Sequence, residues 1–517
     1  MKRARFLAAV LLLGAASAQA QQTQLRPAAP ERVDAAMNAR IRAEGMERSR
    51  VLETAVMLSD VHGPRLAGSP QYRRAAEWAR DELASYGLRN AALEPWGTRR
   101  GWGWEVTRHS VELVSPYYAR IIAYPRAWSP ATEGTVRGEP VLVSIRGEAD
   151  LARYRGQLRG KILLNGEVGP DTTRFSAPGR RFTQAALDSM SRITDPGSPR
   201  SYREDAGGYA ERVRQRQRLF ARMREEGVAA LLEPSRNFRA VNVSAYQAYD
   251  SDVSGAVPAF VVDAGDYARL ANLARRGRAP VLEVSLQTRE STTDSVGFNV
   301  VAEIPGSDPR LRDEVVVAGG HFDSWTAGTG ATDNAAGVAI VMEAARILQA
   351  VGAKPRRTIR VAFWDGEEHE EYFGSRGYVR RHFGDPETGR LLPGQAKVSA
   401  YFNVDHGAGR IRGLYLQGNA AVRPVLGTFL EPFRDLGAAN LTLANTGSTD
   451  HMPFVGVGIP AFTFIQDPLD YNTVTHHTHR DVAAALLEDD LKQAAVVVAS
   501  VLLHTANREE LLPRVGR

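Results

Sequence analysis

Apolar and polar positions follow three different patterns along the chain and so divide it into three regions. The first, residues 33–87, has a mainly helical periodicity. Within it, the segment 72–86 places apolar side chains on one face: Ala75, Ala76, Trp78, Ala79, Leu83 and Tyr86. Gly87 stands where that helix is expected to end, and the Gly- and Pro-rich segment 63–70 predicts a turn-rich loop before it.

The second region has short apolar runs between long polar stretches. A charged helix is predicted at 209–226. The segment 169–203, rich in Pro, Ser, Arg and Asp, is predicted to be a long surface loop, and the Ser- and Thr-rich segment 289–297 a linker. Strands are predicted at four places: 106–123, 141–144, 161–164 and 257–262.

The third region, from residue 298 onward, alternates strands with helices. The predicted strands are 299–304, 314–319, 358–364 and 399–404. The predicted helices are 335–350 and 489–505. This alternation indicates an α/β fold with a mostly parallel central sheet and helices on both faces. Ligands of such a sheet bind at the carboxyl ends of its strands.

The N-terminus has the pattern of an export signal. Lys2, Arg3 and Arg5 precede an apolar stretch, residues 6–16, that is too short to span a bilayer. Ala18-Gln19-Ala20 is a small-x-small cleavage site. We therefore expect a signal peptide at 1–20 and a periplasmic or secreted protein with no membrane attachment after cleavage. A retained N-terminal anchor is the alternative.

Composition narrows the chemistry. The chain has 517 residues, which is more than one ordinary core requires, so several domains are expected. It has no cysteine, which excludes disulfides, thiolate metal ligands and a cysteine nucleophile. Any metal must therefore be held by histidine and carboxylate. The net charge of +6 comes mainly from arginines spread along the chain, a pattern that argues against nucleic-acid binding.

Acids and histidines follow the apolar runs of the third region. His321 comes shortly after the run 315–318, Glu367 and Glu368 come after 358–364, and Asp405 comes after 399–404, while Asp333 precedes the helix 335–350. A last loop, residues 475–481, holds three of the chain's 11 histidines. Each has a simpler explanation alone: a turn, a helix cap at Asp333, a charged surface or a polar loop.

Taken together, these residues form a ligand set for two zinc ions, with cobalt or manganese as substitutes: His321, Asp333, Glu368, Asp405 and His477. Two neighbouring metal ions can activate a water and polarise a carbonyl together. Glu367, next to a ligand, is then the candidate general base. Asp323 is placed to hydrogen-bond the free nitrogen of His321 and orient its ring.

The motifs that carry these residues occur in a fixed order: His321-x-Asp323, Asp333-Asn334, Glu367-Glu368, Asn403-x-Asp405 and His477-Thr478-x-x-Asp481. In this order they resemble the co-catalytic zinc exopeptidases, a family that includes bacterial leucyl aminopeptidase, glutamate carboxypeptidase and plasma glutamate carboxypeptidase. The resemblance implies one zinc on His321 and Asp405, another on Glu368 and His477, and a bridging Asp333. It also implies that Glu367 is the base and that the Asp333-Asn334 peptide bond is cis.

The central part of the chain resembles a protease-associated domain inserted into the peptidase. The resemblance rests on the segments 158–162 and 226–230. It implies four parts: a signal peptide at 1–20, an N-terminal peptidase part at 21–125, a β-rich inserted domain at 126–290 and a C-terminal catalytic part at 291–517.

Two departures from the family pattern affect the site. The segment from Glu367 to Ser375 carries one extra residue and further acids at Glu370 and Glu371. His476 stands where many relatives have a tyrosine, so it is a candidate for substrate contact and the alternative to His477 as ligand. The turn 448–451 matches a substrate-facing segment of relatives, which makes Asp450 and His451 candidate substrate contacts.

The predicted function is that of an exported zinc exopeptidase, an aminopeptidase or dipeptidase, with peptides as its partners. Two alternatives share the fold: a single-zinc acyl transferase of the glutaminyl cyclase type, and an inactive binding module. The sequence does not fix which end of a peptide is recognised or which side chain is preferred. It leaves both a monomer and a homodimer open.

Overall fold

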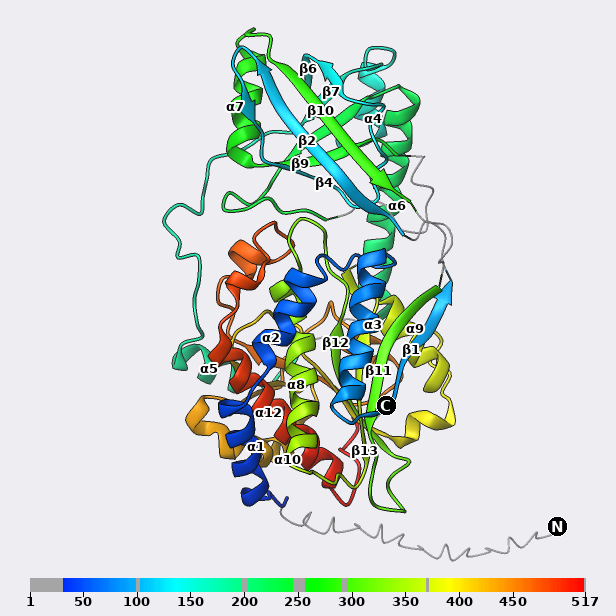
Figure 1. Ribbon diagram of the computed structural model, residues 1–517, viewed down its shortest axis with the longest axis vertical. Helices are drawn as coiled ribbons and strands as arrows, with labels where there is room; N and C mark the ends of the chain where they lie inside the picture. Colours follow the sequence, from blue (N-terminus) through cyan, green and yellow to red (C-terminus); the bar gives the residue numbers. More distant parts are fainter. Residues whose placement is uncertain are drawn as a thin grey trace, which may run out of the picture.

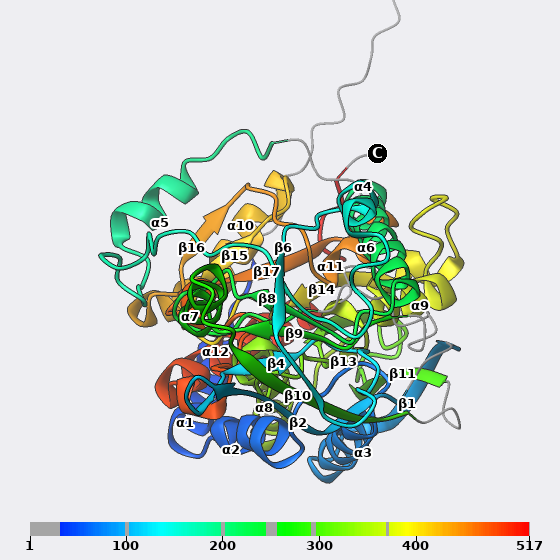
Figure 2. The ribbon, with the colours of Figure 1, turned by 90° about the horizontal axis from the view of Figure 1, so that it is seen from above.

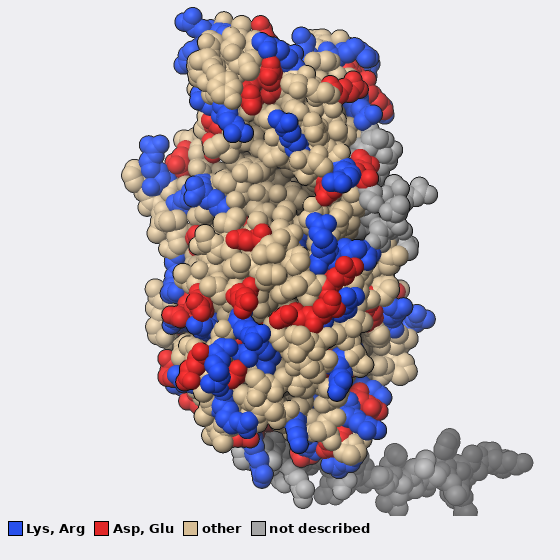
Figure 3. Space-filling view, in the orientation of Figure 1, with Lys and Arg blue, Asp and Glu red and all other residues tan. Residues whose placement is uncertain are grey.

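The computed structural model describes residues 31–98, 103–197, 202–244, 256–290, 296–368 and 372–515. The predicted signal peptide, residues 1–20, lies outside them. Figure 1 shows a lower unit, formed by the elements of residues 31–98 and 296–515, and an upper unit, formed mainly by the elements of residues 105–165 and 202–289, while helix α5 (Gln184–Ser191) lies beside the lower unit. Among the described helices, none has the length and hydropathy that crossing a bilayer requires. On the face drawn in Figure 3, basic and acidic side chains are interspersed.

The lower unit is built around an eight-stranded sheet. Its four central strands run parallel, whereas the first two and the seventh pair antiparallel with a neighbour. In spatial order the strands are β1 (Arg89–Thr98), β11 (Val296–Ile304), β13 (Thr358–Trp364), β12 (Val315–His321), β14 (Val398–Asn403), β17 (Ala461–Gln466), β15 (Ile411–Tyr415) and β16 (Asn440–Thr442).

Alternate residues of the central strands enter different cores, as the two-residue period of a strand requires. In β12, Val316 and Ala318 face one core and Val317 the other. The first core contains α8 (Ala336–Ala350), α12 (Glu488–Asn507) and the N-terminal helices α1 (Ala35–Glu47), α2 (Val51–Val56) and α3 (Pro70–Ser85). The second contains α9 (Phe373–His382) and α11 (His451–Gly456). The α/β fold with helices on both faces is thus confirmed.

The upper unit packs two sheets on each other. An antiparallel sheet has the order β3 (Ala119–Arg120), β2 (Glu105–Ser115), β10 (Val281–Arg289), β5 (Val136–Gly138). A mostly parallel sheet has the order β4 (Ala123–Pro125), β9 (Ala259–Val262), β8 (Ala230–Pro234), β7 (Ile162–Asn165), β6 (Pro140–Val143). Helices α7 (Ala264–Arg275) and α6 (Tyr202–Glu225) lie on opposite sides of the second sheet (Figure 2).

The chain leaves the large sheet after β1 and returns to it at β11, so the upper unit is an insertion between two strands of the lower unit. Its strands β2 and β10 pair with each other and form the stem of that insertion. The predicted boundaries at 126 and 290, and the assignment to a protease-associated domain, stay predictions.

Several predicted elements are confirmed closely. The strand 358–364 has the predicted bounds, and the helices predicted at 335–350 and 489–505 are α8 and α12. The prediction of a single loop at 169–203 was wrong, because the segment contains helix α5 (Gln184–Ser191). Thr183 caps α5 by accepting a hydrogen bond from the amide of Ala186, and the Pro- and Ser-rich composition around it hid this short helix.

Candidate metal centre

The carboxyl ends of three parallel strands bring the predicted ligands to one edge of the large sheet. His321, the last residue of β12, is in register with Trp364 at the end of β13. Gly319 is in register with Asn403 at the end of β14. The acids that follow, Glu368 and Asp405, therefore emerge beside His321, as expected for a parallel sheet.

His321 forms the first part of the centre with two carboxylates. Its Nε2 lies 3.1 Å from Asp405 Oδ1 and 3.2 Å from Asp333 Oδ1. The other oxygen of Asp405 accepts a short hydrogen bond from the hydroxyl of Thr449. Glu367 joins this part, since its carboxylate and the ligand atoms of His321 and Asp405 all lie within 4.8 Å of one another.

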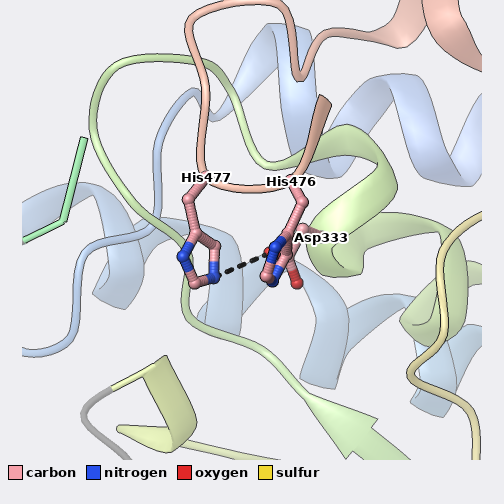
Figure 4. Close-up of side chains that lie close together, drawn as sticks. All are labelled: Asp333, His476 and His477. Carbon is pink, nitrogen blue, oxygen red and sulfur yellow. Dashed lines mark ion pairs between the residues drawn. The ribbon is translucent and has the colours of Figure 1, made fainter. Parts of the chain in front are cut away.

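His477 forms the second part. Its Nε2 lies 2.8 Å from Glu368 Oε2 and 3.2 Å from Asp333 Oδ2. The two oxygens of Asp333 therefore face different histidines, one in each part of the centre. Figure 4 shows Asp333 with His477 and its neighbour His476, whose Nε2 is 3.7 Å from the same oxygen. Of the two histidines, only His477 makes a described ion pair with Glu368.

Asp333 is presented by an unusual start to helix α8. The peptide bond between Asp333 and Asn334 is cis, as the family resemblance implied. The side-chain amide of Asn334 donates from Nδ2 to Val404 O (2.8 Å), and its Oδ1 accepts from the backbone amide of Gly337 (3.0 Å). A Cβ on Gly337 would approach Asn334 Oδ1 and Val404 O to 2.3 Å, so only glycine fits there.

Asp323 acts on two parts of the site. The Nδ1 of His321 lies 3.0 Å from the backbone carbonyl of Asp323 and 3.7 Å from its carboxylate. That carboxylate accepts hydrogen bonds from the amides of Glu367 (3.2 Å) and Glu368 (3.3 Å). The sequence predicted the contact of Asp323 with the imidazole but not its second role, which is to shape the turn that presents Glu367 and Glu368.

We expect Asp323→Ala to lower kcat/KM by about 10- to 100-fold and to weaken metal binding, because partners of ligands usually contribute effects of that size. The measurement is peptide hydrolysis together with metal content after dialysis. Asp308→Ala is the matched control, since Asp308 pairs with Arg356 before the amino ends of β12 and β13, whose carboxyl ends carry the site. Wild-type kinetics in Asp323→Ala would contradict this role.

Asp481 ties the loop of His477 to the segment of Asp333. It accepts from the amide of Thr332 (2.6 Å) and from its hydroxyl (2.8 Å). That hydroxyl also lies 2.9 Å from the hydroxyl of Thr475. Burial raises the pKa of Asp481 to about 7, and the negative charge of Asp333 adds to the shift.

Arg65 is a fully buried cation beneath the site, and sequence reasoning did not single it out. Its guanidinium donates to the backbone carbonyls of Leu58, Phe322, Thr329 and Gly330 at 2.8–3.0 Å. Burial lowers its pKa to about 10, against the opposing attraction of Asp481 and Asp323. The signal that could have found it is its place in the Gly- and Pro-rich segment 63–70, where loops carry function.

The electrostatics of the site are those of crowded, buried carboxylates. Burial raises the pKa of Glu367 well above its ordinary value, and the charge of Asp405 adds to the shift. Burial also raises the pKa of Glu368 to about 7, with Asp333 contributing. Although burial opposes it, the carboxylates of Asp405 and Glu367 hold the pKa of His321 well above its ordinary value. Strongly shifted groups in one crevice are typical of functional sites.

The donor set fits divalent cations. Glu368 Oε1 and Asp333 Oδ2 are buried, and neither accepts a hydrogen bond of proper geometry within the described residues. Three groups of ligand atoms overlap at this centre: His321, Asp333 and Glu368; His321, Glu367 and Asp405; and Asp333, His476 and His477. Buried acceptors of this kind cost free energy unless a cation or a donor satisfies them.

The two other predicted substrate contacts, Asp450 and His451, are buried. Asp450 is fully buried and accepts a 2.5 Å hydrogen bond from the hydroxyl of Ser375, while burial raises its pKa well above its ordinary value. His451 is buried too, with Nε2 3.0 Å from Thr446 O. Their contact with substrate stays a prediction. The added acids Glu370 and Glu371 lie outside the described residues.

Similar proteins were found among sequences and structures. Carboxypeptidase Q from Bos taurus is 26% identical over 473 residues, which are 91% of this chain and 88% of that protein. The crystal structure of a peptidase M28 precursor from Shewanella amazonensis SB2B has a TM-score of 0.67 at 24% identity and covers 93% of this chain and 99% of its own. The structure of a zinc aminopeptidase from Bacillus subtilis, BSAP, has a TM-score of 0.53 at 18% identity, covering 90% and 97%.

The fold, the centre and these similarities define the class of protein: it is a metallo-exopeptidase. The family model of peptidase family M28 matches residues 299–502, the part of the chain that carries every candidate ligand. In this part, residues 299–502, the chain is similar to the peptidases of family M28.

Proposed function

We propose that this chain is an exported exopeptidase, an aminopeptidase or dipeptidase, that uses two zinc ions. One observation carries the proposal: the two oxygens of Asp333 face two separate groups, His321 with Asp405 and His477 with Glu368. A carboxylate so placed suits a bridge between two cations. Similarity to a zinc aminopeptidase supports zinc as the metal.

In this proposal, His321 and Asp405 hold one zinc, His477 and Glu368 hold the other, and Asp333 is shared. When bound, two zinc ions lower the pKa of a water molecule and polarise the carbonyl of the scissile peptide. His477 rather than His476 is the ligand, because its Nε2 contacts both Glu368 and Asp333. His476 then lies at the rim and is free to contact substrate.

Glu367 moves the proton. Its carboxylate lies beside His321 and Asp405 and does not belong to the pair of His477 and Glu368. Both proposed zinc sites have their ligands without it, so Glu367 is not required as a ligand. It accepts a proton from the attacking water and delivers it to the leaving amine. Its burial suits this exchange, since a raised pKa brings a carboxyl group closer to the working pH.

A cavity at the junction of the two units is the proposed place for a substrate side chain. Thr326 in its wall follows Trp325, whose ring centre lies 6.0 Å from that of His477. Apolar and polar side chains share the lining, which includes Pro64, Leu66, Trp104, Glu105, His109 and Tyr124. A cleft between units is a common site for a small ligand.

The test is a metal count and a substrate panel on the purified mature enzyme. We expect two zinc ions per chain, hydrolysis of free dipeptides, and loss of hydrolysis after chelation with recovery on adding zinc. N-blocked and C-blocked dipeptides separate the two polarities: an aminopeptidase cleaves the C-blocked substrate, and a dipeptidase cleaves neither. A single zinc per chain with cyclisation of N-terminal glutamine would overturn the proposal.

A further inference from the structure

The loop that carries His477 is bonded to the upper unit. We call residues 469–481 the histidine loop and residues 237–243 the clamp segment. The amide of Val243 donates to His477 O at 2.8 Å, and the amide of His479 donates to Val241 O at 3.2 Å. These bonds flank a β-bridge between Asn242 and Thr478. The proposed ligand is therefore held by its own backbone carbonyl.

Side chains of the clamp segment add further bonds. Asn242 Nδ2 donates to His476 O at 3.2 Å, and Asn237 Nδ2 donates to Thr473 O at 3.0 Å. In the other direction, His479 Nδ1 accepts from the amide of Val241 at 3.0 Å. The ring of His479 also stacks on Tyr124, with 5.2 Å between ring centres. The loop is thus held at several points along its length.

The conformation of His477 explains why such a hold matters. Its φ is 59°, in the left-handed region that non-glycine residues occupy at a cost. A backbone in that region persists where its surroundings fix it. Bonds to the carbonyls of His476 and His477, on both sides of the strained residue, supply that fixation.

The clamp segment is itself anchored by buried apolar contacts and hydrogen bonds, so it can hold the loop of His477 in place. Val241 and Val243 are fully buried and pack with Val261 of β9 and with Tyr124. The hydroxyl of Ser235 accepts from the amides of Asn237 and Asn242, each at 3.2 Å. The segment is therefore anchored to the sheet of the upper unit, and Ala327 of the lower unit packs against the same apolar group.

We propose that the upper unit positions one half of the metal centre, with Asn237 and Asn242 as positioning residues for His477. The proposal rests on His477 being a zinc ligand. Within the described residues, no hydrogen bond from the upper unit reaches the other four proposed ligands, so the effect is specific to the site of His477 and Glu368. The position of the upper unit relative to the lower unit thereby affects how tightly the site of His477 and Glu368 binds zinc.

The experiment titrates zinc into the metal-free, full-length mature enzyme in competition with a chromophoric chelator. Asn237→Ala/Asn242→Ala is compared with His477→Ala and with Asn272→Ala, a control at an exposed position of α7 in the same unit. We expect the double variant to bind one of two zinc ions about ten-fold or more weakly and the other normally, as loss of two hydrogen bonds implies. Excess zinc should restore its hydrolysis, and Asn272→Ala should match the wild type.

The outcomes separate the two proposals. Two tightly bound zinc ions in His477→Ala would overturn the ligand assignment itself. Loss of one zinc in His477→Ala, with wild-type affinity for both in the double variant, would overturn the clamp alone. If the double variant unfolds before titration, Asn242→Ala and His479→Phe, which keeps the stacking on Tyr124, take its place with the same two outcomes.

Discussion

Replacing Glu367 with glutamine is expected to lower kcat by about 10²- to 10⁴-fold, the usual contribution of a general acid–base group. The same variant should keep both zinc ions. Glutamine has nearly the shape of glutamate but cannot accept a proton at neutral pH. The amide of residue 367 keeps its hydrogen bond to the carboxylate of Asp323, so the turn is preserved.

The neighbouring acid supplies the contrast that makes this result specific. Glu368→Gln should lose zinc as well as activity, because Glu368 meets His477 at 2.8 Å and serves as a ligand. The measurements are kcat on a cleaved dipeptide and zinc per chain, with Glu47→Gln as an exposed control. If Glu367→Gln hydrolyses peptides near the wild-type rate, Glu367 is not the general base, whatever the metal content of the variant.

The sequence predicted which acids and histidines lie close together, because the positions of such residues in a parallel sheet follow from the strand ends. An apolar run followed by an acid or histidine marks such an end, and β12, β13 and β14 each show it. The family resemblance then supplied the pairing of residues and the cis peptide at Asp333. The periodicity of apolar residues predicts neither the pairing of these residues nor a cis peptide bond.

The elements that were missed lack such a pattern. Strand β16 has three residues and β15 only five, too short for a clear period of two. Helix α5 lies in a composition typical of loops. Arg65, the second contact of Asp323 and the clamp on His477 depend on hydrogen bonds to backbone carbonyls or amides of distant segments. A sequence does not display which backbone groups remain to be satisfied after folding.

The backbone acceptors around Arg65 lead to the second large expected effect. Arg65→Met should lower the free energy of unfolding by about 3–5 kcal/mol, because each buried acceptor left without a donor costs about 1–3 kcal/mol. The carbonyls of Phe322 and Thr329 would lose the guanidinium as a donor, whereas that of Gly330 would keep the amide of Ala335. An acceptor that is left buried and unpaired is costly. These carbonyls belong to the segment between His321 and Asp333, so zinc binding should weaken too.

Arg65→Lys separates charge from geometry. Lysine keeps the positive charge near Asp481 and Asp323 but presents one compact ammonium where the guanidinium forks among carbonyls on several segments. We therefore expect Arg65→Lys to lie close to Arg65→Met in urea unfolding of the metal-free enzyme. Arg42→Met, which removes an ion pair whose side chains are 40% and 56% exposed, should change little. Wild-type stability in Arg65→Lys would mean that the positive charge of residue 65, and not its hydrogen bonds, stabilises the segment between His321 and Asp333.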